Sequence, residues 1–130
     1  MNDELMDAAR AAKGHAHAPF SYFPVGCALE AEDGEIVTGC NVESASYGLT
    51  MCAERVAIFK GVSEGKTRFV RAAITTDSAA LTPPCGACRQ LLWEFAPEAE
   101  VILFNAKGQS KTYTVRELIP DAFDADSLVS

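Results

Sequence analysis

The sequence predicts an α/β fold in which a mixed five-stranded sheet is flanked by helices. Two short apolar runs surround Asp33 and Gly34, a pair of residues typical of a β-hairpin turn. Further along the chain, helix-like and strand-like segments alternate, which indicates β–α–β units beside the hairpin. Because 130 residues are enough for one hydrophobic core, we expect a single domain over residues 1–130.

The first half of the chain supplies a helix and the hairpin. Leucine, methionine and alanine side chains recur at roughly helical spacing over residues 3–16, which predicts an opening helix. Residues 17–24 contain two prolines and several aromatic side chains, so we expect an irregular loop there. The two hairpin strands fall within residues 25–43, and small residues over 44–50 predict a second loop.

The second half alternates between helices and strands. Residues 52–65 contain the apolar side chains of a helix that ends near glycine. A second helix is predicted over residues 85–96, after a proline pair, and Pro97 ends it. A short, largely apolar run predicts a buried strand over 69–77. The remaining elements are strands over 100–105 and 111–115 and a short helix over 116–120.

The composition is that of a folded protein without a membrane-spanning segment. Hydrophobic residues make up 48% of the chain and charged residues 22%. No apolar run approaches the roughly 20 residues that cross a bilayer, and the N-terminus lacks the apolar part of a signal peptide. An odd number of cysteines, five, fits a reducing compartment, so we expect a cytoplasmic protein. The net charge of −7 disfavours nucleic acid polymers and anionic membranes as partners and favours a small-molecule ligand.

Three cysteines stand at the starts of two predicted helices. Cys85 and Cys88 are three positions apart and share one helix face, so both sulfurs reach a common point. Alone, this pair also fits a redox dithiol, half of a structural zinc site or a coincidence. Cys52 offers a third thiolate from the other helix. Three protein ligands leave one position of a tetrahedral zinc ion open, which is typical of a catalytic site.

A fourth cysteine ligand would make the site structural instead. Cys27 and Cys40 are the candidates. Strand alternation places Cys27 in step with Val25 and Leu29, and Cys40 in step with Val42. We therefore expect both as small core residues, as is common for free cysteine, and one Zn²⁺ per chain. We expect the two histidines, which fall in no ligand motif, to be non-ligating as well.

Glu54 follows Cys52 by two positions. A glutamate in a first helical turn is usually a solvated charge favoured by the helix dipole. Here it completes the pattern ligand-x-Glu followed by Pro-Cys-x-x-Cys, which is typical of zinc deaminases. In that chemistry a metal-activated water attacks the carbon that carries an exocyclic amine. An unligated carboxylate carries the water's proton to the ring nitrogen and later to the departing ammonia, so we predict Glu54 as the catalytic residue.

The charge of three thiolates is a difficulty for the metal. With Zn²⁺ the thiolates sum to −1, which weakens a Lewis acid. Arg55 is next to Glu54 and is expected to donate hydrogen bonds to the sulfurs, although an ordinary surface ion pair is its alternative role. Each of the two helix N-termini adds roughly +0.5 charge.

Asn41 and Glu43 are expected on one face of the second hairpin strand. An amide and a carboxylate together offer a donor and acceptors for hydroxyl groups. Solvent-facing polar residues at a strand end are the alternative reading of this pair.

At these motifs the sequence resembles the cytidine deaminase family in its small homotetrameric form. The resemblance covers nearly the whole chain and keeps the order and spacing of the motifs. It implies a three-layer cytidine deaminase-like fold and the zinc-dependent deamination of cytidine and 2′-deoxycytidine to uridine and 2′-deoxyuridine in pyrimidine salvage. The segments that carry it are APFSYFPVGCAL (18–29), GCNVESASYG (39–48), CAERVAIFKGVSEG (52–65), PCGACRQ (84–90) and ELIPDAF (117–123).

The resemblance also implies roles for individual residues around a nucleoside. Asn41 and Glu43 are expected to hold the ribose hydroxyls, and Phe23 to lie against the pyrimidine nucleoside. The Ala53 backbone and Glu54 are expected to read the edge of the base. The resemblance further implies Cys52, Cys85 and Cys88 as zinc ligands, Glu54 as the proton shuttle and Arg55 as a hydrogen-bond donor to the sulfurs.

In similar tetramers, residues equivalent to Tyr47 and Phe123 come from neighbouring subunits. We therefore expect a homotetramer whose pockets are shared between subunits.

Four positions depart from the family pattern, and two of them, Phe20 and His17, replace tyrosines that are common in the family. Two other functions remain as alternatives. Ser44 stands where the family usually has Asn, and Pro83 where it usually has Ser; Pro83 removes an N–H group and a hydroxyl near the metal loop. The alternative activity is deamination of another aminopyrimidine nucleoside, such as a blasticidin-type antibiotic. The noncatalytic alternative is a zinc-stabilised structural module, which requires four protein ligands. The acidic charge opposes a polynucleotide deaminase.

Overall fold

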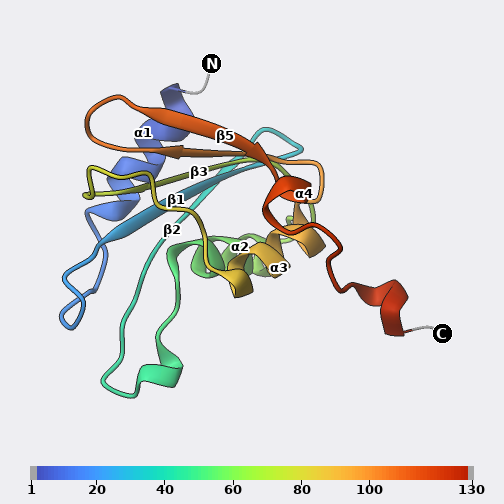
Figure 1. Cartoon of the computed structure of the whole chain (residues 1–130), viewed down its shortest axis with the longest axis horizontal. Helices are drawn as coiled ribbons and strands as arrows, with labels where there is room; N and C mark the ends of the chain where they lie inside the picture. The colour runs from blue at the N-terminus through green and yellow to red at the C-terminus, as the bar shows by residue number, and fades with distance from the viewer. Residues whose placement is uncertain (1–2, 129–130) are drawn as a thin grey trace.

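The computed structural model describes residues 3–128 and contains the predicted mixed five-stranded sheet (Figure 1). The strand order is β2-β1-β3-β4-β5. Strand β1 pairs antiparallel with β2 and β3, β3 runs parallel to β4, and β5 pairs antiparallel with β4. The strands are β1 (Val25–Ala31), β2 (Ile36–Cys40), β3 (Phe69–Thr76), β4 (Glu100–Phe104) and β5 (Ser110–Thr114).

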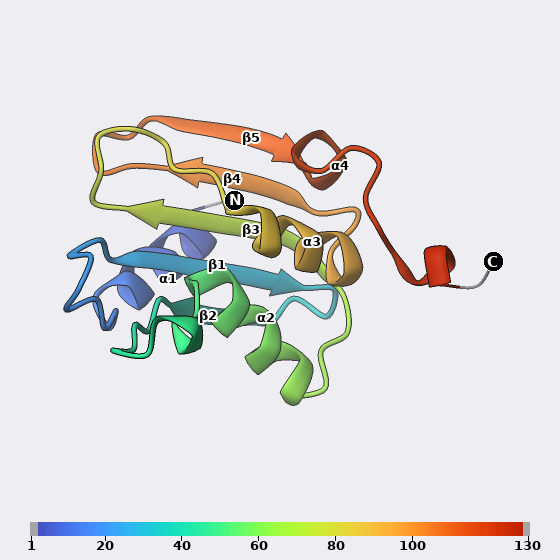
Figure 2. The same cartoon turned by 60° about the horizontal axis from the view of Figure 1, so that its bottom comes forward.

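Helices cover both faces of the sheet, which gives three layers as expected. Helix α1 (Asp3–Lys13) packs on one face, and α2 (Ala53–Ser63) and α3 (Gly86–Phe95) lie on the other (Figure 2). The short helix α4 (Val115–Leu118) follows β5 directly. Two 3₁₀ helices complete the described chain. One, η1 (Tyr47–Leu49), lies in the loop predicted over 44–50, and the other, η2 (Ala125–Leu128), lies in the C-terminal segment.

The alternation of side chains in β1 divides the core between the two faces. Cys27 and Leu29 belong to the larger apolar cluster beneath α2 and α3, whereas Ala28 belongs to the smaller cluster beneath α1. Within residues 3–128, none of the helices combines the length and apolar character needed to cross a membrane.

Two glycines let the helices lie directly on the sheet. A Cβ atom at Gly39 of β2 would lie 2.5 Å from the Ala57 nitrogen and 2.6 Å from the Ala53 oxygen of α2. A Cβ atom at Gly26 of β1 would lie 2.0 Å from the Ala9 oxygen of α1. Because neither position has room for a side chain, α1 lies directly on β1 at Gly26, and the first turns of α2 are fixed against β2 at Gly39.

The ends of two elements differ from the prediction by three residues. The opening helix ends at Lys13 rather than 16, and the second hairpin strand ends at Cys40 rather than 43. Beyond Cys40 the chain leaves the ladder, because Val42 instead forms isolated bridges with His17 and Met51. Asn41 and Glu43 therefore lie past the end of β2, at the edge where the site is built.

Candidate active site

The structure brings together the three cysteines that the sequence singled out. Cys52 precedes α2, Cys85 precedes α3, and Cys88 lies in the first turn of α3. Their sulfur atoms all lie within 4.8 Å of one another. The sulfurs of Cys52 and Cys85 are 3.9 Å apart, and those of Cys85 and Cys88 are 3.4 Å apart. Zinc–sulfur bonds of about 2.3 Å in a tetrahedron separate two sulfurs by roughly 3.8 Å, so this donor set fits one zinc ion per chain.

The surroundings of the Cys52 thiol favour its ionised form. Cys52 and Cys85 occupy N-cap positions, yet neither side chain caps its own helix. Their sulfurs are thus left available to the cluster, next to the positive ends of two helix dipoles. The pKa of Cys52 is lowered to about 5, mainly because the Cys88 thiol donates a hydrogen bond to its sulfur and also because Arg55 lies beside it.

Arg55 takes the position expected of a charge-compensating residue. Its Nη2 atom donates a hydrogen bond to the Cys52 sulfur over 3.2 Å. Within the described part of the chain, its buried Nε atom has no hydrogen-bond partner. A guanidinium group held against the thiols offsets the excess negative charge that three thiolates bring to a divalent ion.

The remaining cysteines and the histidines lie outside this cluster. Cys27 is fully buried in the core, as predicted. Cys40 is only half-buried, so its prediction as a core residue was partly wrong. Cys40 pairs with Gly26, which places it on the α1 side of the sheet, away from the cluster. His15 and His17 are exposed, and the metal-ligand group found within residues 3–128 includes neither of them.

Glu54 lies in the first turn of α2 beside the thiols and is almost completely buried, with 5% of its surface exposed. Burial raises the pKa of this carboxyl group to about 7, and the negative charge of Cys52 adds to the effect. A carboxyl group with a pKa near neutrality both accepts and returns a proton at physiological pH. The geometry and the pKa together suit a proton carrier.

A pocket of about 410 Å³ opens beside the thiols. Its wall joins segments that are far apart in the sequence. Most of the predicted substrate residues line it together with Cys52 and Cys85; these are Phe23, Asn41, Glu43, Ala53 and Glu54. Its volume is within the usual range for a small-molecule site.

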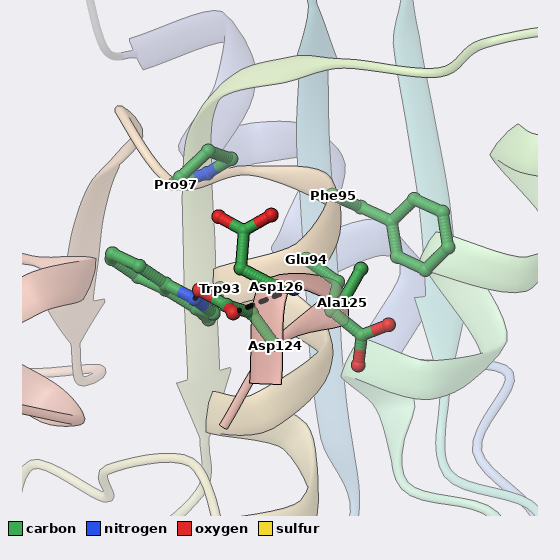
Figure 3. Close-up of a pocket in the computed structure, with 7 residues that line it drawn as sticks. All are labelled: Trp93, Glu94, Phe95, Pro97, Asp124, Ala125 and Asp126. Atoms are coloured by element: carbon green, nitrogen blue, oxygen red, sulfur yellow. Dashed lines mark hydrogen bonds between the residues drawn. The ribbon is translucent and has the colours of Figure 1, made fainter. Parts of the chain in front are cut away.

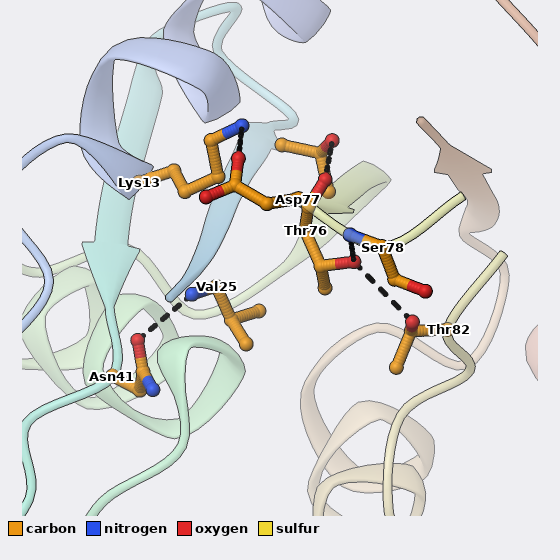
Figure 4. Close-up of polar contacts among 8 residues, drawn as sticks. Lys13, Val25, Asn41, Thr76, Asp77, Ser78 and Thr82 are labelled. Atoms are coloured by element: carbon orange, nitrogen blue, oxygen red, sulfur yellow. Dashed lines mark hydrogen bonds and ion pairs between the residues drawn. The ribbon is translucent and has the colours of Figure 1, made fainter. Parts of the chain in front are cut away.

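Asn41 is buried at this edge with its amide group in use on both sides. Its Oδ1 atom accepts a hydrogen bond from the Val25 nitrogen over 2.9 Å, as Figure 4 shows. Its Nδ2 atom donates to the Phe23 carbonyl over 2.9 Å. Asn41 therefore joins the end of β2 to the loop that carries Phe23, and each polar atom keeps further hydrogen-bonding capacity.

Glu43 has a comparable role on the other side of the loop. Its Oε1 atom accepts hydrogen bonds from the Phe20 and Ser21 nitrogens over 3.0 and 3.1 Å, and its Oε2 atom accepts one from the Ser21 hydroxyl. These contacts, with the Ser21 hydroxyl first among them, hold the pKa of Glu43 below its usual value. Ser21 also lines the pocket, and sequence reasoning gave it no role.

Thr82 is a second pocket residue that sequence reasoning missed. It stands directly before Pro83, and both line the pocket. Its hydroxyl oxygen lies 3.4 Å from the hydroxyl oxygen of Thr76 at the end of β3 (Figure 4). The hydroxyl that Pro83 lacks is therefore present one residue earlier.

The structure leaves Tyr47 and Phe123 outside the 410 Å³ pocket. Tyr47 is 76% exposed and lines a neighbouring pocket of about 240 Å³. Phe123 is 58% exposed on the C-terminal segment, where its carbonyl accepts a hydrogen bond from Gln90 of α3 over 2.6 Å. A further pocket, of about 360 Å³, lies between Trp93 and the segment that carries Asp124 and Asp126 (Figure 3).

Arg89, which follows Cys88 in α3, holds the segment that leads into Cys85. Its Nε atom donates to the Pro84 carbonyl and its Nη1 atom to the Leu118 carbonyl, each over 2.8 Å. The residue before Cys85 is thereby tied to the end of α4.

Comparisons with known proteins agree with this geometry. A family described as "Cytidine and deoxycytidylate deaminase zinc-binding region" matches residues 1–104. The chain is 46% identical over 125 residues to the cytidine deaminase of Halalkalibacterium halodurans, covering 95% of this chain and 94% of the relative. It also matches the crystal structure of cytidine deaminase from Burkholderia pseudomallei with a TM-score of 0.91 and 43% identity, covering 95% of this chain and 99% of that one. A more distant relative, blasticidin-S deaminase of Bacillus cereus, is 34% identical over an alignment of 104 residues that covers 74% of each chain. The chain thus belongs to the cytidine and deoxycytidylate deaminase family.

Proposed function

We propose that this protein catalyses the zinc-dependent hydrolytic deamination of cytidine and 2′-deoxycytidine, forming uridine or 2′-deoxyuridine and ammonia. The observation that carries the proposal is the buried Glu54 carboxyl group beside a cluster of three thiols, in the wall of a pocket large enough for a nucleoside. The relatives named cytidine deaminase support the choice of substrate. We propose that the reaction serves pyrimidine salvage in the cytoplasm.

Cys52, Cys85 and Cys88 would hold the zinc ion, with Arg55 offsetting the charge of the thiolates. A zinc ion with three protein ligands activates a water molecule for attack at neutral pH. Cys52 and Cys85 line the pocket, so an ion held by the three thiols would supply its activated water next to the substrate. Because the three ligands lie at the starts of α2 and α3, the fold would hold them in place before the ion and the substrate bind.

Glu54 would move the protons. Its carboxylate would take a proton from the attacking water and deliver it to the ring nitrogen of the base. It would then take the second proton from the hydroxyl group added to the carbon and give it to the leaving amine, which departs as ammonia. Burial, which raises the pKa of this carboxyl group to about 7 in the metal-free protein, favours a group that both accepts and returns a proton. Because Glu54 lies in the first turn of α2, the adjacent Ala53 backbone is positioned to contact the same edge of the base.

The other pocket residues would orient the nucleoside. Phe23 supplies an aromatic surface for the base, and the remaining hydrogen-bonding capacity of Asn41 and Glu43 suits the ribose hydroxyls. Since the ribose hydroxyls are remote from the reacting carbon, we expect Asn41 and Glu43 to determine the KM for the substrate more than kcat.

Two measurements test the proposal. Zinc per chain is determined by metal analysis, with about one ion expected from the single three-thiol cluster found in the described residues. Conversion of cytidine to uridine is then followed by ultraviolet absorbance. We expect Glu54→Gln to keep its zinc and lose turnover by at least about 10²–10⁴-fold, the usual contribution of general acid–base catalysis. Retained turnover in a zinc-loaded Glu54→Gln variant would remove Glu54 from the mechanism.

Substrate choice is tested in the same assay. We expect turnover of cytidine and 2′-deoxycytidine to exceed that of blasticidin S, the substrate that the name of the more distant relative indicates. A higher kcat/KM for blasticidin S would transfer the proposal to the antibiotic. Loss of activity when a 5′-phosphate is added to the nucleoside is also expected, because the pocket is surrounded by an acidic protein.

We further propose that the protein assembles as a homotetramer in which Tyr47 and Phe123 complete the pockets of neighbouring subunits. Their high exposure in the single chain supports this assignment. A mixture of two impaired variants tests it. In mixed tetramers of Glu54→Gln and Phe123→Ala chains, a site with an intact Glu54 receives an intact Phe123 from the other chain. Activity above the sum of the two separate variants is expected, and strictly additive activity would contradict shared pockets.

A further inference from the structure

We propose that Ser21 is a positioning residue for nucleoside binding: its hydroxyl joins Glu43 to the backbone of Phe23 and so holds the ribose-contacting and base-contacting walls of the pocket together. This inference rests on the proposed function, because it assigns those two walls to a nucleoside. Ser21 would thus join the residues that shape the pocket, although it takes no direct part in the chemistry.

The first observation is a continuous chain of hydrogen bonds across the pocket wall. The Ser21 hydroxyl donates to Oε2 of Glu43 and accepts a hydrogen bond from the Phe23 nitrogen over 3.1 Å. The Ser21 nitrogen donates to Oε1 of the same carboxylate over 3.1 Å. One serine thus contacts Glu43 twice and Phe23 once, and all three residues line the 410 Å³ pocket.

The second observation is an unfavourable backbone conformation between the two contact points. Tyr22 has a φ of 55°, in the left-handed region that bulky residues rarely adopt. Its side chain is 83% exposed, so packing of that side chain does not explain the conformation. The turn brings the Phe23 nitrogen back to the Ser21 hydroxyl. Strain of this kind persists where surrounding contacts enforce it, and here the Ser21 and Glu43 hydrogen bonds are such contacts.

The consequence is that Glu43 and Phe23 are not placed independently. Without the hydroxyl, Glu43 keeps two backbone donors but loses its link to the Phe23 backbone, and the strained turn is free to relax. Phe23 then moves relative to Glu43, although both side chains remain. Glu43 contacts ribose hydroxyls that do not react, and Phe23 packs against the base in the bound substrate as well as in the transition state. The change therefore weakens binding of the substrate and of the transition state equally.

The test is a kinetic comparison of Ser21→Ala with a matched control. Ser78 makes the same local contact, accepting a hydrogen bond from the nitrogen two residues later over 3.1 Å, but it does not line the pocket. We expect Ser21→Ala to raise the KM for cytidine by at least about 5-fold, as expected for a lost hydrogen bond, with kcat within about 2-fold. Ser78→Ala and Ser21→Thr, which keeps the hydroxyl, should stay within about 2-fold in both constants.

A double-variant comparison separates positioning from general loosening of the loop. In a Glu43→Ala background the link is already broken, so adding Ser21→Ala should change KM by less than about 2-fold. A KM for Ser21→Ala within 2-fold of wild type, or a full additive penalty in the Glu43→Ala background, would overturn the inference. Active wild type with an unchanged Ser21→Ala would overturn this inference alone, whereas absence of cytidine turnover in wild type would overturn the proposed function itself.

Discussion

Replacing Gly39 with alanine should displace the catalytic end of α2. The added Cβ would lie 2.5 Å from the Ala57 nitrogen and 2.6 Å from the Ala53 oxygen, whereas ordinary contacts begin near 3.4 Å. Both atoms belong to the helix backbone, which cannot rotate away as a side chain does. The first turns of α2 must therefore move off the sheet by roughly 1 Å, carrying Cys52 and Glu54 away from the cysteines of α3.

The expected effects are separable in two assays. Overpacking of this size destabilises a protein by about 1–3 kcal/mol, measured as a lower free energy of unfolding in urea. A displacement of about 1 Å at a catalytic group lowers turnover by roughly 10²-fold, measured as kcat/KM for cytidine well below the unfolding temperature. We also expect faster loss of zinc to a chelator, because one ligand moves relative to the other two.

Gly26→Ala is the matched control on the opposite face of the sheet. Its Cβ would lie 2.0 Å from the Ala9 oxygen, so it displaces α1, which contributes no residue to the pocket. We expect a similar or greater loss of stability with zinc retention and kcat/KM close to wild type. Wild-type activity in Gly39→Ala, or an equal loss in Gly26→Ala, would refute the reasoning that Gly39 fixes the site.

Three further predictions concern the pH response, the metal and a buried amide. In metal-free protein the pKa of Glu54 is about 7, against 4.5 ordinarily, so the folded state keeps a proton that the unfolded chain releases. The contribution of Glu54 to stability should therefore fall by up to about 3 kcal/mol as the pH rises from 4.5 through 7, whereas the lowered pKa of Cys52 acts in the opposite sense over the same range. The Glu54 contribution is measured as the difference in urea unfolding free energy between wild type and Glu54→Gln at about pH 5 and pH 8, and a difference that does not change with pH would contradict it. Arg55→Ala should weaken zinc binding by roughly 10–100-fold in chelator competition, whereas Arg10→Ala, which removes an exposed ion pair on α1, should not; unchanged zinc affinity would disprove the charge compensation. Asn105→Ala removes a side chain that is 1% exposed and makes four hydrogen bonds, so we expect a loss of about 3 kcal/mol in unfolding free energy; a loss below about 1 kcal/mol would show that water replaces it.

The sequence predicted the elements of the fold well because their patterns are local. Asp33 and Gly34 do form the hairpin turn, with Gly34 at a φ of 90°. Cys85 and Cys88 share a helix face because three residues separate them, and Cys52 joins them because β-strands bring two helix starts to one edge.

Features that depend on contacts between distant loops could not be predicted in this way. The strand pattern continued to residue 43, yet Val42 pairs with His17 and Met51 and ends β2 early. The hydrogen bond between Ser21 and Glu43 joins residues 22 positions apart in the sequence, and no periodic pattern of residues predicts it. Ser21 itself is an exposed serine in a proline-rich loop, which is the commonest setting for a residue of no special role.

The half-buried state of Cys40 has a comparable explanation. Strand alternation correctly places Cys40 and Glu43 on opposite sides of the sheet. It does not show which of the two faces is covered more completely by helices. Beneath α1 the apolar cluster is the smaller of the two, and Cys40 lies at the end of an edge strand.

Zinc K-edge X-ray absorption of the metal-loaded protein tests the central claim most directly, because it counts the atoms bonded to the ion. Three sulfurs at about 2.3 Å and one oxygen at about 2.0–2.1 Å are predicted. A fourth sulfur, a histidine nitrogen in place of the oxygen, or only two sulfurs would contradict a catalytic site built by Cys52, Cys85 and Cys88.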